Sequence, residues 1–135
     1  MNAIREALAD SLKASIPGTQ ISPYVLANTT MPSIDIIPDE TIYDLALQRG
    51  FDMAHFRIRV YVGLTTDIGA QKLLGRYLSP TGDYSVKVAA ELDPQLGGLV
   101  DDVRVVSGGA QLTFVNESGQ PTLGSQWTTR VYWSN

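Results

Sequence analysis

The sequence predicts an α+β fold: a single domain over residues 1–135, with a mainly antiparallel or mixed sheet of about four to six strands and two to three helices packed on one face. Three observations lead to this prediction. A chain of 135 residues has the usual size of one domain. Hydrophobic residues make up 44% of the chain and charged residues only 18%, which is enough apolar material for a core. Segments with the period of helices are grouped between segments with the alternation of strands, which is typical of an α+β layer.

The first expected element is a helix over residues 2–14. Apolar side chains recur at helical spacing at Ile4, Leu8 and Leu12, and Pro17 lies just beyond the last of them. We interpret this apolar stripe as the side of the helix that packs against the core.

Residues 20–38 are expected to be extended, with residues 33–37 as the best strand candidate. Prolines at positions 23, 32 and 38 each remove a backbone donor, which indicates sheet edges or strand ends. Residues 39–49 could hold one helical turn, with Ile42 and Leu45 turned inward.

The clearest strand covers residues 52–64. Polar and apolar side chains alternate there, so we expect a sheet that is covered on one face and polar, partly basic, on the other. The expected inner set is Ala54, Phe56, Ile58, Val60 and Val62, and the expected outer set is His55, Arg57, Arg59 and Tyr61.

Two helices are expected after this strand. The first has helical spacing through Ile68, Leu74 and Tyr77, and Thr66 or Asp67 can cap its start. The second is a short helix over about residues 85–92, followed by a glycine-containing turn at residues 96–99.

Three strands are expected in the C-terminal part. Residues 100–106 and 110–115 would form a hairpin, because a Ser-Gly-Gly sequence at residues 107–109 lies between them. A polar stretch over residues 116–125 would then lead to a last strand at residues 126–133. The expected inner side chains of that strand are Trp127, Thr129, Val131 and Trp133, which we interpret as core rather than as a stacking platform.

The sequence offers little catalytic chemistry. It has no cysteine, which excludes disulfides, zinc–thiolate sites and a thiol nucleophile, and its single histidine, His55, is expected on the sheet surface. The acidic residues Glu91, Asp93, Asp101 and Asp102 lack the spacing of a calcium-binding loop. No glycine-rich nucleotide-binding motif is present. We therefore expect an interaction protein rather than an enzyme, with no cofactor and no metal.

The net charge of −4 disfavours electrostatic binding to DNA or to an anionic membrane, and no apolar run approaches the length of a membrane span. The excess negative charge lies in residues 35–52, which contain five acidic residues and one arginine. This segment is either a solvated acidic loop or a surface that does not hold nucleic acid passing nearby.

Several local features are similar to those of one group of viral proteins. A proline-rich extended segment at residues 24–38 follows the N-terminal helix, and a strand follows at residues 56–62. The sequence LGRYLSPTG at residues 74–82 then precedes a second, short helix, and residues 85–98 look like neck proteins of actinobacterial phages. Over residues 2–133, the chain resembles the small tail terminator, or head–tail joining, proteins of long-tailed bacteriophages.

The resemblance implies a structural protein of the virion, made in the host bacterial cytoplasm. Such proteins assemble as a ring of identical subunits, usually six, on the finished tail tube. The ring stops tail polymerisation and presents a surface to the head connector protein, and DNA passes through its lumen without specific binding. No catalytic or ligand-binding residues can be carried over, because the matching features are structural.

A ring needs two complementary surfaces on each subunit, and the sequence contains two of opposite charge. The candidate interface residues are Asp35, Asp39, Glu40 and Asp44 on the acidic side, and Arg57 and Arg59 on the basic side. Arg130, on the polar face of the last strand, could add to the basic side, although helices could equally cover that face. The alternatives are another neck protein, such as a head completion or connector subunit, or a small monomeric binding domain without catalysis. Molecular mass measured against concentration would separate the ring proteins from a monomer.

Overall fold

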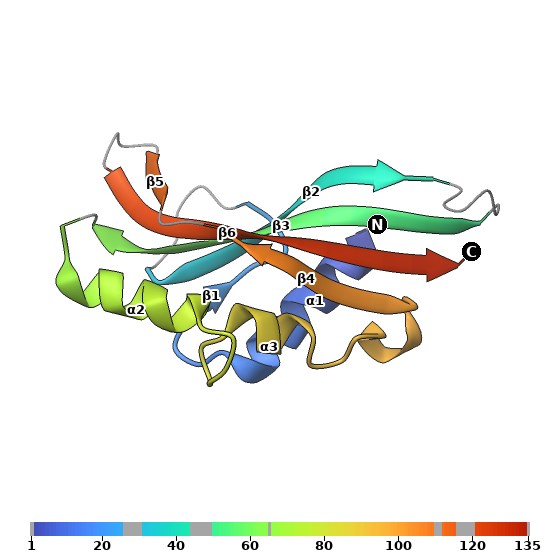
Figure 1. Ribbon diagram of the computed structural model, residues 1–135, viewed down its shortest axis with the longest axis horizontal. Helices are drawn as coiled ribbons and strands as arrows, with labels where there is room; N and C mark the ends of the chain where they lie inside the picture. The colour runs from blue at the N-terminus through green and yellow to red at the C-terminus, as the bar shows by residue number, and fades with distance from the viewer. Residues whose placement is uncertain are drawn as a thin grey trace.

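The computed structural model describes residues 2–25, 31–43, 50–64, 66–109, 112–115 and 121–134. Within these ranges one mixed six-stranded sheet is covered on one side by three α-helices, which confirms the predicted α+β fold (Figure 1). No helix in these ranges is both long enough and apolar enough to cross a membrane.

The described strands of the sheet are β1 (Gln20–Ile21), β2 (Ser33–Ile42), β3 (Phe51–Leu64), β4 (Asp102–Gly108), β5 (Leu112–Val115) and β6 (Pro121–Ser134). The two longest, β3 and β6, lie side by side at the centre. The order of the strands is β1-β2-β3-β6-β4, and β5 also pairs with β6. The β1–β2 pair is parallel and every other described pair is antiparallel.

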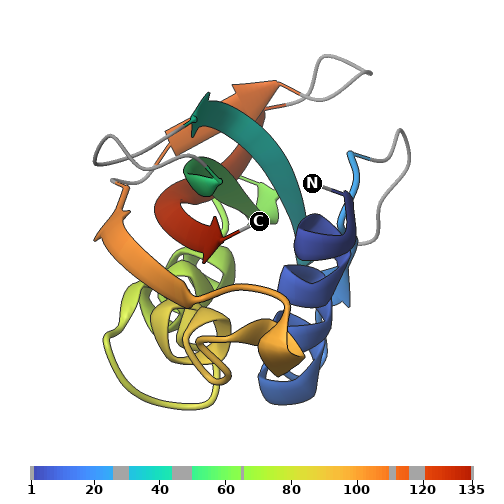
Figure 2. The ribbon, with the colours of Figure 1, turned by 90° about the vertical axis from the view of Figure 1, so that its right-hand side faces the viewer.

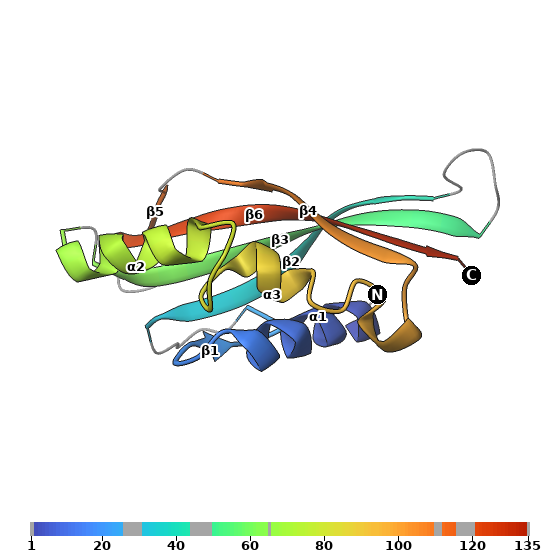
Figure 3. The ribbon, with the colours of Figure 1, turned by 60° about the horizontal axis from the view of Figure 1, so that its bottom comes forward.

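The helices are α1 (Asn2–Ser15), α2 (Ile68–Leu78) and α3 (Val86–Ala90), followed by the short 3₁₀ helix η2 (Leu96–Gly98). Figures 2 and 3 show α1 on the β1–β2 side of the layer and α2 and α3 on the other side. The predicted starts are confirmed: the Asp67 side chain accepts from the Gly69 N–H and the Ser85 side chain from the Val88 N–H. Ile68 was expected to face inward, but it lies in the first turn of α2 and is exposed.

The core lies between the helices and the inner face of the sheet. The alternation predicted for β3 is confirmed, since the side chains of Ala54, Phe56, Ile58, Val60 and Val62 are all buried. β6 contributes Trp127, Thr129 and Val131, and Trp133 packs against the core from a partly buried position. The helices contribute mainly Ile4, Leu8, Leu12, Leu74, Tyr77, Val86, Ala89 and Ala90.

The helical turn predicted for residues 39–49 is wrong where the structure describes it, because β2 continues as a strand to Ile42. The pairing with β3 shifts register between Pro38 and Thr41, as expected for a bulge at a residue that cannot donate a hydrogen bond. Thr41 and Ile42 then pair with Ala54 and Met53. The rest of that prediction, including Leu45, lies outside the described residues.

The predicted hairpin between residues 100–106 and 110–115 is also wrong. β4 and β5 do not pair with each other; both pair with β6, which begins at Pro121, inside the stretch that we expected to be polar loop. Gly109 donates a backbone hydrogen bond of 2.6 Å to the Gln126 carbonyl, and a Cβ on Gly109 would lie 2.6 Å from that oxygen. This glycine therefore allows close approach to β6 rather than a tight turn.

Each lateral edge of the sheet is contacted by a charged side chain from the helical layer. Arg5 of α1 donates from Nε to the Ile36 carbonyl of β2 at 2.8 Å. At the other edge, the Val105 N–H of β4 donates to Oε2 of Glu91, just after α3, at 2.9 Å. These two backbone groups therefore cannot pair with a further strand.

Candidate functional site

One face of the sheet lies opposite the helices, and we call it the open face (Figures 1 and 3). Charged side chains from four adjacent strands lie on it. Its charged residues are Asp35, Asp39 and Glu40 from β2, His55, Arg57 and Arg59 from β3, Arg130 from β6, and Asp102 and Arg104 from β4. Alternation places Asp35 and the residues of β3, β6 and β4 here, whereas Asp39 and Glu40 lie at the register shift between Pro38 and Thr41.

Among the ion pairs described on the open face, the Asp35–Arg59 pair is the most buried and has two hydrogen bonds. The two residues lie directly opposite each other on β2 and β3, and the guanidinium donates from Nε to Oδ1 at 2.8 Å and from a terminal nitrogen to Oδ2 at 3.0 Å. Their side chains are only 10% and 20% exposed. Geometry of this kind makes a stronger pair than an isolated surface contact.

Tyr61 belongs to the same network. Its hydroxyl donates to Oδ2 of Asp35 at 3.2 Å, and the Arg59 guanidinium lies 5.6 Å from the centre of its ring. Burial raises the pKa of Tyr61 well above its ordinary value, and the negative charge of Asp35 raises it further. The Tyr61 ring also contacts the Phe114 ring edge-on, at 4.9 Å between centres, so this end of the open face combines charge with aromatic surface.

The remaining predicted interface residues form looser contacts. Arg57 donates to Asp39 at 3.2 Å with both side chains well exposed, and Nδ1 of His55 lies 3.8 Å from the Glu40 carboxylate. His55 thus occupies the predicted surface position. Asp44, the other predicted residue, lies outside the described residues.

The acidic and basic groups that we expected to meet between neighbouring subunits thus pair within one chain. The reason is the antiparallel pairing of β2 with β3, which lays Asp35 beside Arg59 and Asp39 near Arg57. A contact between subunits through these residues stays a prediction. Reversal of Arg57 and Arg59 to Glu would also break the Asp35 pair inside the subunit, so it is not a clean test of assembly.

A second group of basic side chains crosses the open face nearer β4. Arg104, Arg130 and His55 lie on three neighbouring strands, with Arg104 directly opposite Arg130 and Arg130 directly opposite His55. We call these three residues the basic row. Arg130 donates from Nε to Nε2 of His55 at 3.2 Å, and Arg104 lies 3.6 Å from the Asp102 carboxylate. Among the described residues, Arg130 has no acidic partner within ion-pair distance.

The sequence contained two signals for the basic row, since His55 and Arg130 were both expected on the polar faces of their strands. The pairing of Arg104 with Arg130 was hidden because residues 100–106 were assigned to a different hairpin. Like charges directly opposite each other on a sheet are destabilising, so the Arg104–Arg130 pair does not help to hold the subunit together.

The acidic residues near η2 have structural roles. Glu91 pairs with Lys87 at 2.6 Å in addition to its contact with β4, and Asp93 accepts the backbone N–H groups of Gln95 and Gly97. Asp101 accepts from the Ser134 hydroxyl at 2.7 Å. Over the ranges that the structure describes, no group of three or more potential ligands could hold a metal ion.

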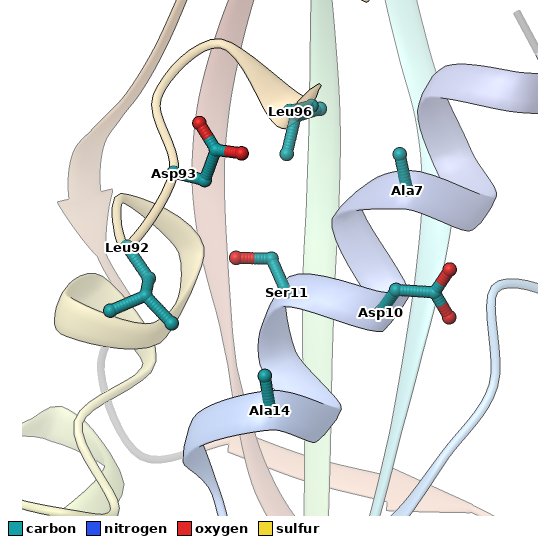
Figure 4. A pocket seen from close by; sticks show the side chains of 7 residues that line it. All are labelled: Ala7, Asp10, Ser11, Ala14, Leu92, Asp93 and Leu96. Carbon is teal, nitrogen blue, oxygen red and sulfur yellow. The ribbon is translucent and has the colours of Figure 1, made fainter. Parts of the chain in front are cut away.

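A recess of about 360 Å³ lies in the helical layer, on the opposite side of the molecule from the open face (Figure 4). It is lined by Ala7, Asp10, Ser11 and Ala14 of α1 and by Leu92, Asp93 and Leu96. Ser11 points into it and donates to the Ala89 carbonyl at 2.7 Å. The lining carboxylates are those of Asp10 and Asp93, but the Ser11 hydroxyl donates to the Ala89 carbonyl and the Asp93 carboxylate accepts from backbone N–H groups, so neither is arranged as the base of a nucleophilic serine.

The chain matches no protein-family model, and it matches no curated protein sequence.

Proposed function

We propose that this protein is a structural subunit of a long-tailed bacteriophage. It caps the tail tube as a homo-oligomeric ring, expected from the resemblance to have six subunits. The ring ends polymerisation of the tail tube protein and offers the surface to which the head connector attaches. It belongs to the neck of the virion, and DNA passes through it without being held.

The observation that supports this proposal best is the open face itself. A sheet covered on one side only presents a broad ordered surface, and the Asp35–Arg59 and Asp39–Arg57 pairs offset the charges of its β2–β3 half within the subunit. Such a surface attracts phosphate weakly, which suits a protein that lies beside passing DNA. The ring and the binding to the tail tube are inferred from the resemblance, and the paired charges are compatible with both.

The experiment is to remove the protein from its phage and measure the tails by electron microscopy. We expect tails of irregular, excessive length without heads, and a supplied copy of the wild-type gene should restore normal particles. Tails of normal length with attached heads would overturn the proposal. Tails of normal length without heads would instead indicate a head completion or connector subunit.

A second measurement tests the role of charge. The purified protein should not shift duplex DNA in a gel at physiological salt and micromolar protein concentration, because a net charge of −4 opposes such binding. A shift that weakens as salt is added would contradict this part of the proposal.

A further inference from the structure

Among the described residues, the charge of the basic row is only partly offset, because Arg104 has one carboxylate partner and Arg130 has none. Arg104 is 70% exposed in its side chain and its closest carboxylate oxygen, on Asp102, is 3.6 Å away. Arg130 is exposed, and it donates to the ring of His55 rather than to an acid among the described residues. The two arginines lie directly opposite each other, so both gain if carboxylates approach from outside.

The recess in the helical layer is lined by two carboxylates, whose negative charge is complementary to the basic row. Asp10 is exposed on α1 and has no hydrogen bond or ion pair among the described residues, and Asp93 lies across the recess from α1 (Figure 4). Asp93 is held by backbone N–H groups only, so its negative charge has no cationic partner in the described part of the subunit. On the α1 side the recess is lined by the small side chains of Ala7, Ser11 and Ala14, which leave room for a long side chain.

These two surfaces lie on opposite sides of the molecule, since the basic row faces away from the helices and the recess lies among them (Figures 1 and 4). A contact between such surfaces on two copies is head-to-tail, and head-to-tail contacts close into rings when the rotation permits. Arginine suits the recess well, because its aliphatic stem can lie on Ala7, Ala14 and Leu92 while its guanidinium reaches a carboxylate.

We propose that the basic row of one copy docks on the helical layer of the next copy, with Arg104 and Arg130 directed to Asp10 and Asp93. The inference rests on the proposed ring and names the surfaces through which its subunits meet. It also covers the part of the open face that would otherwise attract phosphate.

Two charge-reversed variants test the docking. The first carries Arg104→Glu and Arg130→Glu. The second carries Asp10→Lys and Ala14→Lys, which changes the net charge of α1 from 0 to +3 and leaves the bonds of Asp93 intact. The molecular mass of each is measured against concentration by light scattering, with circular dichroism to check the fold, and Lys72→Glu on the exposed side of α2 is the control.

We expect wild type and the Lys72→Glu variant to assemble, and each charge-reversed variant to need at least about tenfold more protein. An equal mixture of the two variants should assemble again, because the new glutamates of one then face the new lysines of the other. Copies would alternate in that mixture, so native mass spectrometry should find closed rings with even numbers of subunits only. A milder pair, Arg104→Gln with Arg130→Gln, replaces the first variant if reversal prevents folding.

A wild-type protein that stays monomeric at every concentration would overturn the docking proposal. So would normal assembly of either reversed variant, or a mixture that fails to assemble. The tail-length experiment is independent of these outcomes: normal tails without the protein would overturn the proposed function while leaving self-association as measured.

Discussion

The two faces of the central strands are built from alternate residues of the same segments, yet they are held by different forces. On the inner face of β3, Ile58 is fully buried against the helical layer. Its neighbour Arg59 points to the open face and is held by hydrogen bonds to Asp35. The inner face depends on the removal of apolar surface from water, which has no direction, whereas the open face depends on which residues lie opposite each other.

This difference predicts that substitutions on the inner face strongly lower the free energy of unfolding, whichever residue lies opposite. Substitutions on the open face should cost less and depend on a single partner.

The largest effect is expected for Ile58→Ala, which should lower the free energy of unfolding by about 2–5 kcal/mol because it leaves a cavity between sheet and helices. Arg57→Ala, one residue away on the open face, should lower it by less than about 1 kcal/mol. Urea unfolding followed by circular dichroism measures both. Similar losses for the two variants would show that the faces are assigned incorrectly.

A close backbone approach gives the next effect. A Cβ on Gly124 of β6 would overlap the Val60 carbonyl oxygen and lie 2.8 Å from the Phe114 ring, so Gly124→Ala should destabilise the protein by about 3 kcal/mol. Gly75→Ala is the control, since a Cβ there meets nothing within 4 Å and alanine favours a helix. It should stabilise the protein by roughly 0.5–1 kcal/mol. A tolerated Gly124→Ala would mean that β3 and β6 are farther apart than described.

Local pattern was sufficient to predict the inner face and the helices. The apolar alternation of β3, the stripe of α1 and the caps at Asp67 and Ser85 all depend on residues close in sequence. Pairing between distant segments was not predictable in the same way. The hairpin signal at residues 107–109 uses the same glycine chemistry as a close approach to β6, and only the position of Gln126 distinguishes the two.

The candidate site shows the same limit. Asp35 and Arg59 were both identified from charge, but their pairing inside one subunit depends on the register of β2 against β3. His55 and Arg130 were expected on polar strand faces, but Arg104 was not, because the register of β4 against β6 decides that it lies opposite Arg130. A one-residue slip in either register would move these side chains to the opposite face, so composition and period cannot supply the contact.

The Asp35–Arg59 pair is the test of the open face. Arg59→Met should cost about 2 kcal/mol, because it leaves the largely buried Asp35 carboxylate with only Tyr61 as a side-chain donor among the described residues. In a double-mutant cycle with Asp35→Asn, most of that loss should be coupling energy between the two residues. The cycle for the exposed Arg57 and Asp39 should give less than about 1 kcal/mol. Equal coupling energies in the two cycles would contradict the distinction between the two pairs.

The smallest effect is expected in the opposite direction, at Thr129 on the inner face of β6. Its side chain is fully buried, and its hydroxyl has no hydrogen-bond partner among the described residues. Because a buried hydroxyl without a partner is unfavourable, Thr129→Val should raise the free energy of unfolding by about 1 kcal/mol. Thr128→Val, the next residue and half-buried on the open face, should change it by no more than about 0.5 kcal/mol. A loss of stability in Thr129→Val would indicate that the hydroxyl is hydrogen-bonded. The inner face would then depend on polar contacts as well as on the burial of apolar surface.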